Sequence, residues 1–182
     1  MSKKLIKFVK KHFKEEVLDS HSRLGNDTVV IKRDRLPEIV EMLRDDDTTK
    51  LDYLRAITGV DYLHRQPRFE VVYVLYSMEH KHMLTLRVVV DEGDCKVPSI
   101  HHLYGCAGWT EREVWDMYGI EFEGHPDLRR ILLYEEFEGH PLRKDYDKQA
   151  AQPRIELLSQ ERDSVEEYNV FVKQQPSRGS RE

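Results

Sequence analysis

The sequence predicts an α+β fold, in which helices pack on a mainly antiparallel sheet to form a two-layer domain. The apolar pattern runs helix, strand, helix and then several strands, an order that favours two layers over a doubly wound sheet. Of the 182 residues, 39% are hydrophobic and 35% are charged, as in a globular chain with a polar surface. We expect this α+β domain over residues 1–92, an irregular, loop-rich segment over 93–146 and an extended tail over 147–182.

Two helices are expected in the first part of the chain. Over residues 3–16, apolar residues recur at helical spacing between lysines, which predicts an amphipathic helix. A second helix is expected after Asp34, which offers an N-cap, with Pro37 in the first turn. Its predicted core face consists of Leu36, Ile39, Val40 and Leu43.

The strands are predicted from short runs of β-branched and aromatic residues. One is expected at 27–32, and three more follow at 51–61, 69–77 and 82–90. Only a short polar link separates the last two, so we expect these three strands to form an antiparallel meander.

Composition excludes several classes of function. A net charge of −5 argues against a general nucleic-acid-binding protein, and no apolar run approaches the roughly 20 residues that a transmembrane helix needs. No glycine-rich dinucleotide or phosphate motif is present, and Cys95 and Cys106 form no CxxC pair. The N-terminus lacks a cleavage site typical of a secretion signal, so a reducing, cytoplasmic setting is expected.

The N-terminal helix is also strongly basic. Six lysines and no acidic residue occur within the first fourteen residues. Such a helix either presents a solvated face or contacts anionic lipid or an acidic protein surface.

A further helix is predicted from Thr110 to about Gly119. Thr110 and Glu113 have the spacing of a capping box, and Gly119 suits a left-handed C-cap. Arg112 and Asp116 are spaced i,i+4, so we expect them to pair.

The hexapeptide EFEGHP occurs twice, at 121–126 and at 136–141. The first copy is followed by Arg129 and Arg130, and the second by Arg143 and Lys144. Because proline restricts itself and the preceding histidine to extended geometry, neither copy continues a helix. We expect two loops that project paired cations as docking surfaces.

His125 and His140 of these repeats have three interpretations. They could bind a metal with Glu113, His101 or Cys106, although the close spacing of zinc ligands is missing. His125 could join Asp116 and Arg129 in an acid–base cluster, but nothing supplies a substrate cradle. The simplest interpretation is that each imidazole is hydrogen-bonded and holds a turn.

The stretch from Trp109 to Tyr146 resembles the signature of the 30 kDa subunit family (the C subunit) of respiratory complex I, the proton-translocating NADH:quinone oxidoreductase. Much of the resemblance lies in the run EREVWDMYGIEFEGHPDLRRILL. The resemblance implies that segment 93–146 packs both on its own domain and on partner subunits. It implies an interface made of Glu111, Arg112, Glu113, Asp116, Gly119, His125, Arg129, Arg130, His140, Arg143, Lys144 and Asp145.

Family membership would make the chain an accessory subunit of the peripheral arm, with no catalytic, cofactor or metal site of its own. Flavin and iron–sulfur clusters would reside in other subunits. The expected partners are subunits D and B, with membrane association indirect, on the cytoplasmic side of the bacterial inner membrane. Two alternatives remain, the equivalent subunit of a hydrogenase-type membrane complex and a metal-dependent enzyme using His125 and His140.

Overall fold

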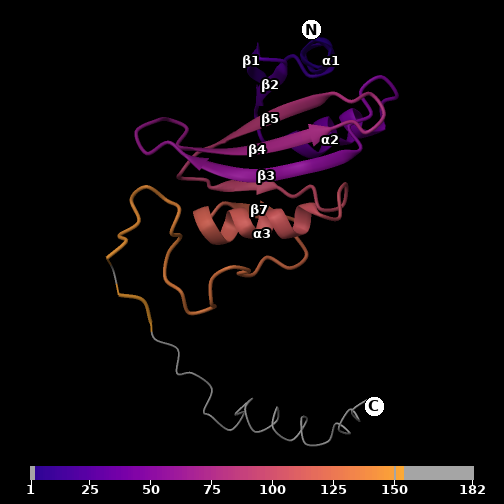
Figure 1. The fold of residues 1–182 in the computed structure, drawn as a ribbon. Helices are drawn as coiled ribbons and strands as arrows, with labels where there is room; N and C mark the ends of the chain where they lie inside the picture. The colour runs from indigo at the N-terminus through magenta and orange to yellow at the C-terminus, as the bar shows by residue number, and fades with distance from the viewer. Residues whose placement is uncertain (1–2, 150, 154–182) are drawn as a thin grey trace, which may run out of the picture. The chain divides into compact units, whose positions relative to one another are not determined.

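The computed structural model describes residues 3–149 and 151–153. This part of the chain has a mixed α+β fold. It is built on a five-stranded sheet with the strand order β1-β2-β5-β4-β3 (Figure 1). The sheet strands are β1 (Val17–Arg23), β2 (Asn26–Ile31), β3 (Tyr53–Asp61), β4 (Phe69–Tyr76) and β5 (Met83–Val90). The other elements are α1 (Lys4–His12), α2 (Leu36–Asp45), α3 (Ala107–Tyr118), β6 (Lys96–Pro98) and β7 (Glu121–Glu123). The predicted α+β class is confirmed.

The sheet is antiparallel except where β2 pairs with β5. β3, β4 and β5 follow one another as the predicted meander. β1 was not predicted from the sequence, and it pairs with β2 through a tight hairpin. Leu24 and Gly25 both have positive φ, as the two central residues of a type I′ turn require. β1 forms the sheet edge and has few buried side chains, so it lacks the alternation that reveals a strand.

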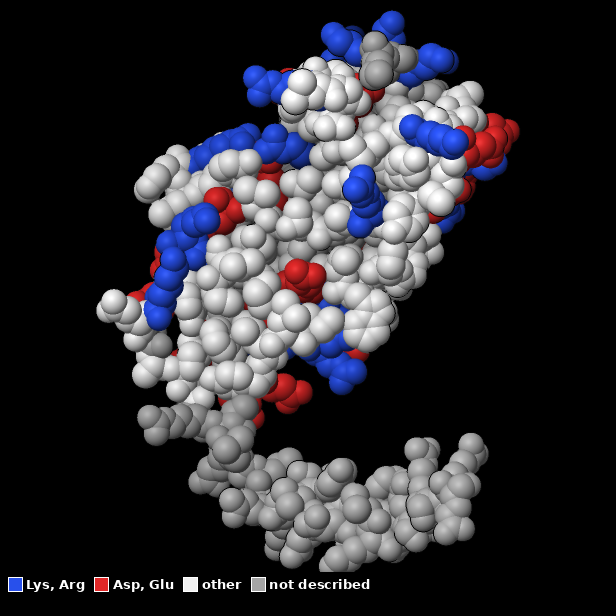
Figure 2. Space-filling model, in the orientation of Figure 1, with Lys and Arg blue, Asp and Glu red and all other residues white. Residues whose placement is uncertain are grey.

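α1 and α2 contribute apolar stripes to the core. The predicted stripe of α2 is fully buried, and Pro37 lies in its first turn. The predicted cap at Asp34 is wrong, because Arg35 occupies the N-cap position and makes no side-chain capping bond. α1 ends at His12, earlier than predicted, because Phe13 leaves the helical conformation while its side chain stays in the core. Lys and Arg side chains project where α1 meets the surface (Figure 2).

α3 follows the sheet and packs against β3. Gly59 of β3 allows this approach, since a Cβ there would lie 2.6 Å from the Tyr118 ring. The helix begins at Ala107, so the predicted capping box is wrong. Thr110 lies inside the first turn, where its hydroxyl donates to the carbonyl of Ala107 at 3.1 Å. The predicted end is confirmed, because Gly119 adopts the left-handed conformation with φ of 74°.

The described residues from Lys3 to Ala151 belong to one compact unit. The predicted tail, 147–182, lies outside the described residues except for 147–149 and 151–153. Among the residues that are described, no helix is long and apolar enough to cross a membrane.

Candidate functional site: the repeat loops around α3

The second EFEGHP copy caps the C-terminus of α3. The last four carbonyls of a helix have no donors within the helix and need other partners. The Gly119 amide donates to the carbonyl of Trp115, and the Leu142 amide donates to the carbonyl of Met117 at 3.1 Å. His140 Nδ1 donates to Asp116 O at 2.9 Å, and Arg143 Nε donates to Tyr118 O at 2.5 Å. All four carbonyls therefore have a donor, three of them from the repeat loop.

This cap requires a glycine at position 119. A Cβ there would lie 2.5 Å from two atoms of the His140 ring and 2.9 Å from Arg143 Nη2. The positive φ adds strain for any other residue. Burial lowers the pKa of His140, which favours the neutral imidazole. Arg143 also lies over the ring of Phe69, 5.0 Å from its centroid.

Asp116 binds the loop that joins the two repeats. Its Oδ2 accepts hydrogen bonds from the consecutive amides of Ile131, Leu132 and Leu133 at 3.1, 2.9 and 3.0 Å. Its Oδ1 lies 2.7 Å from Arg130 Nη1. Burial alone would raise the pKa of this carboxyl, but the amides and the guanidinium together lower it. Asp116 thus acts as a fully buried carboxylate around which the loop is wound.

The guanidinium groups of Arg130 and Arg112 bind backbone carbonyls of this same chain. Arg130 donates to the carbonyls of Phe137 and Gly139 at 2.7 and 3.2 Å, and its guanidinium lies near the Trp115 and Phe137 rings. Arg112 donates to the carbonyls of Arg129 and Arg130 at 3.0 and 2.9 Å. The expected Arg112–Asp116 pair is therefore wrong, because both side chains turn toward the loop instead of toward each other.

The first repeat copy holds the N-terminal turns of α3. His125 Nε2 donates to the Gly108 carbonyl at 3.0 Å, while its Nδ1 accepts from the Asp127 amide at 3.0 Å. Both nitrogens are occupied, and His125 and His140 bind positions of α3 that are about 12 Å apart at 1.5 Å per residue. The simplest interpretation, hydrogen-bonded imidazoles holding turns, is confirmed. The described residues contain no group of three or more typical metal ligands.

Glu111 lies in this same region and is fully buried. The Ser99 hydroxyl donates to Oε2 at 2.5 Å, and the Ile100 amide donates to Oε1 at 2.8 Å. Burial raises its pKa, and these two donors only partly offset that effect. Glu111 thereby ties the segment before α3 to the helix.

A second buried ion pair, missed by sequence reasoning, anchors the end of the signature segment. Arg68 forms a bidentate pair with Asp61, at 2.9 and 2.8 Å, and also binds Asp145 at 2.7 and 3.0 Å. The Lys144 amide donates to Asp61 at 2.7 Å. Arg68 lowers the pKa of both carboxyl groups. The sequence offers one indication of the Arg68–Asp61 pair: Asp61 ends β3, and the oppositely charged Arg68 directly precedes β4.

These contacts divide the expected interface residues into two groups. Glu111 and Asp116 are enclosed, and the guanidinium groups of Arg130 and Arg143 are directed inward. The predicted residues that remain exposed are Glu113, Arg129, Lys144 and Asp145. Sequence reasoning overlooked three exposed apolar side chains of the same segment, Trp109 at 62%, Leu132 at 63% and Leu142 at 47%. Arg112 connects the two regions, since it lies over the Trp109 ring while binding the loop before Leu132.

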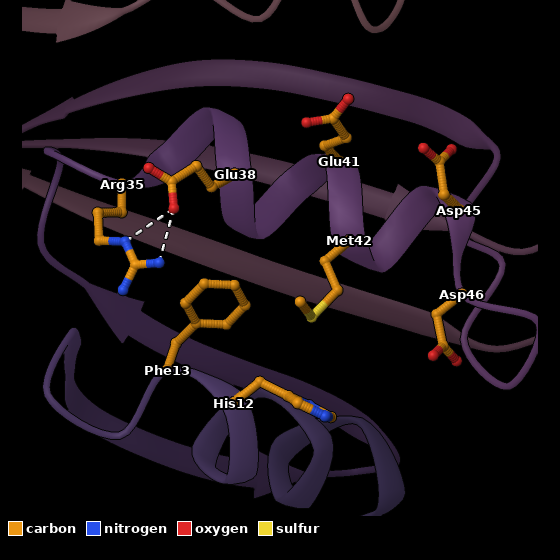
Figure 3. A pocket seen from close by; sticks show the side chains of 8 residues that line it. All are labelled: His12, Phe13, Arg35, Glu38, Glu41, Met42, Asp45 and Asp46. Atoms are coloured by element: carbon orange, nitrogen blue, oxygen red, sulfur yellow. Dashed lines mark hydrogen bonds and ion pairs between the residues drawn. The ribbon is translucent and has the colours of Figure 1, made fainter.

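A separate groove of about 580 Å³ lies between α1 and α2 (Figure 3). Its lining includes Phe13, Met42 and several carboxylates. Arg35 pairs with Glu38 on the α2 side of the groove at 2.6 Å, and Arg44 pairs with Asp45 at 2.6 Å. The groove is distant in sequence from the signature segment, and its charges are partly neutralised by neighbours.

Comparison with known proteins identifies the family. Residues 29–152 match the family model described as respiratory-chain NADH dehydrogenase, 30 Kd subunit. The chain belongs to this family. It is 41% identical over 138 residues to the C subunit of NADH-quinone oxidoreductase from Citrifermentans bemidjiense, covering 76% of this chain and 84% of that protein. With the C subunit from Roseiflexus sp. it shares 45% identity over 131 residues, covering 72% and 75%.

One solved structure agrees with this assignment to the 30 kDa subunit family, and a second shares the fold. A trypsin-resistant fragment of Nqo5 is 35% identical with a TM-score of 0.60, and the match covers 68% of this chain and 98% of the fragment. A chain of the membrane-bound sulfane sulfur reductase, an archaeal respiratory membrane complex, has a TM-score of 0.68 at 17% identity, covering 99% and 98%. The second likeness concerns the fold alone.

Proposed function

We propose that this chain is a cofactor-free, peripheral-arm subunit of a proton-translocating NADH:quinone oxidoreductase. It supports electron transfer from NADH to quinone by assembling with subunits D and B. Membrane association is then indirect, on the cytoplasmic side of the inner membrane. The isolated chain is expected to have no catalytic site, with flavin and iron–sulfur clusters in other subunits.

The observation that carries this proposal is an exposed surface on the family-matched segment, which we call the assembly patch: Trp109, Arg129 and Leu132. Aromatic side chains and arginine are the residues most often found at the energetic centres of protein interfaces. The backbone beneath the patch is tied to α3, because Asp116 accepts the Leu132 amide and Arg112 donates to the Arg129 carbonyl. Glu113, Lys144 and Asp145 supply further exposed charges on the same segment.

Affinity purification of the tagged chain from a mild-detergent membrane extract tests this proposal. We expect recovery of subunits D and B together with NADH:quinone activity. Replacing Trp109 and Leu132 together by alanine should reduce that recovery at least tenfold, because loss of a hot-spot residue costs about 2 kcal/mol or more.

Met78→Ala provides the matched control, since Met78 is also 62% exposed but lies just beyond β4. Equal recovery with the patch variant and this control would contradict the assembly patch. Recovery with hydrogenase-like subunits and no NADH oxidation would instead support the related membrane complex.

A further inference from the structure

A cavity of about 500 Å³ lies at the end of the sheet where β2, β3 and β5 begin and β4 ends. Its lining comes from separate parts of the chain, namely the start of α1, the turn between β1 and β2, β3, and the turn between β4 and β5. Three of the lining side chains are cationic: Lys4, Arg55 and Lys81. We call this space the cation-lined cavity.

Arg55 reaches the cavity from a β-bulge. The pairing of β3 with β4 shifts between Leu54 and Ala56, so Arg55 is an extra residue in the register of these two strands. Bulges often redirect a side chain and are frequent beside functional sites. The Arg55 guanidinium Nη1 lies 3.8 Å from the sulfur of Met83, which belongs to β5, on the far side of β4. The irregularity in β3 thus places a cation at the cavity.

Lys81 reaches the cavity from the turn between β4 and β5. Its φ is 53°, a left-handed conformation that is unfavourable for a residue with a Cβ. The Lys81 amide donates to the Ser77 carbonyl at 3.0 Å, and the Ser77 amide donates to the His82 carbonyl at 3.0 Å. Strained backbone of this kind is frequent at ligand-binding sites. Two independent irregularities, the bulge and the left-handed turn residue, therefore place cations at the same cavity.

The three cations of the cavity have no counterion in the part of the chain that the structure describes. Within residues 3–149 and 151–153, Lys4, Arg55 and Lys81 form no ion pair. Among the described lining residues, the one carboxylate is that of Asp27, so with His82 neutral the lining carries a net charge of +2. A cleft lined mainly by one sign of charge concentrates ligands of the opposite sign.

We propose that the cation-lined cavity binds a phosphate monoester of a small organic molecule. Such an ester carries a charge of about −1.5 to −2 at pH 7, which matches the net charge of the lining. Arginine binds phosphate oxygens through its planar fork, and lysine binds them as a point charge. Tyr76 and Met83 also line the cavity and offer apolar surface to the organic part of the ligand. The cavity volume falls within the range of about 300–1,000 Å³ that is usual for small-molecule sites.

The cation-lined cavity is separate from the assembly patch. The cavity is lined by α1 and by the ends and turns of the sheet, whereas Trp109 lies on α3, and Arg129 and Leu132 follow β7. A variant of the cavity should therefore recover partner subunits as the unaltered chain does. Failure of ligand binding and failure of assembly can thus be told apart.

Isothermal titration calorimetry of the full chain with phenyl phosphate, at fixed ionic strength, tests the proposal. We expect phenyl phosphate to bind at least about tenfold more tightly than benzoate, which has the same ring but a single negative charge. Inorganic phosphate, which lacks the ring, should also bind more weakly. Lys4→Gln combined with Lys81→Gln should weaken the binding of phenyl phosphate at least about tenfold, because hydrogen bonds to charged groups are stronger than neutral ones.

Lys10→Gln combined with Lys32→Gln provides the matched control. It also removes two exposed lysines, one of them on α1, but neither lines the cavity. This control should bind phenyl phosphate as tightly as the unaltered chain. Absence of binding to the unaltered chain, equal weakening in both variants, or equal affinity for benzoate would overturn the proposal. Equal affinity for inorganic phosphate would overturn the part given to Tyr76 and Met83.

Discussion

Asp116 and Arg130 form a buried ion pair that joins α3 to the loop between the two repeats, with Arg130 Nη1 2.7 Å from Asp116 Oδ1. The side chain of Asp116 is fully buried and that of Arg130 is 13% exposed. Around this pair, the carboxylate also receives three backbone amides, and the guanidinium also donates to two backbone carbonyls. The pair therefore organises the backbone of the loop as well as balancing charge.

Asp116→Ala should destabilise the chain by about 3–5 kcal/mol, because it leaves a buried guanidinium and three amides without their acceptor. Urea denaturation of the purified chain measures this loss. Glu113→Ala, an exposed carboxylate on the same helix, is the control and should change stability by less than about 0.5 kcal/mol. Similar stability losses for the two variants would contradict the role given to Asp116.

The neighbouring arginines Arg129 and Arg130 should behave differently. Arg130→Ala should lower the free energy of unfolding, because its guanidinium bonds are internal. Arg129, whose side chain is 68% exposed, forms its one ion pair within residues 3–149 and 151–153 with exposed Asp127. Arg129→Ala should leave stability within about 0.5 kcal/mol and reduce recovery of partner subunits. A larger loss of melting stability in Arg129→Ala than in Arg130→Ala would reverse this assignment.

Gly119→Ala should destabilise the chain by at least about 1 kcal/mol, since a left-handed conformation alone costs about 1–2 kcal/mol for a residue with a Cβ. The added methyl group would also displace His140 and Arg143. Gly105→Ala is the control, because a Cβ at Gly105 would meet no atom within 4 Å. Thermal melting of both variants would decide the matter, and near-equal midpoints would count against a glycine requirement at position 119.

Stability should fall in acid because Asp61 and Asp116 have pKa values below their ordinary value of 3.8. An unfolded chain binds protons to these groups more readily than the folded chain does. Their contribution is therefore fully present above pH 3.8 and is lost as pH falls through the folded-state values.

Arg68→Leu should flatten this acid dependence, because it removes the main cause that lowers the pKa of Asp61. Arg35→Leu, which removes an exposed pair with Glu38, should leave the slope unchanged. Urea denaturation above and below pH 3.8 gives both slopes, and an unaltered slope in Arg68→Leu would contradict the prediction.

Local patterns predicted much of the fold. The core stripe of α2 and the strands of the meander follow from apolar periodicity, and the end of α3 follows from Gly119. The start of α3 was misplaced because the capping-box spacing at Thr110 also fits a position inside the first turn.

Many residues of the site were predicted from the sequence, but the directions of their side chains were not. Sequence spacing identified Arg130 and Asp116, yet it could not tell an exposed cation from one that pairs with a buried carboxylate fourteen residues earlier. The contact of Arg68 with Asp145 spans 77 positions, so no local pattern reveals it. The 62% exposure of Trp109 likewise follows from no local pattern.

The cap on α3 also has a consequence for the order of events during synthesis. The carbonyls of Asp116, Met117 and Tyr118 receive their donors from His140, Leu142 and Arg143. A nascent chain that has emerged only as far as Tyr118 would therefore hold an unfinished helix end. Because translation proceeds at about 5–20 residues per second, that end would stay open for at least a second or so before its donors leave the ribosome.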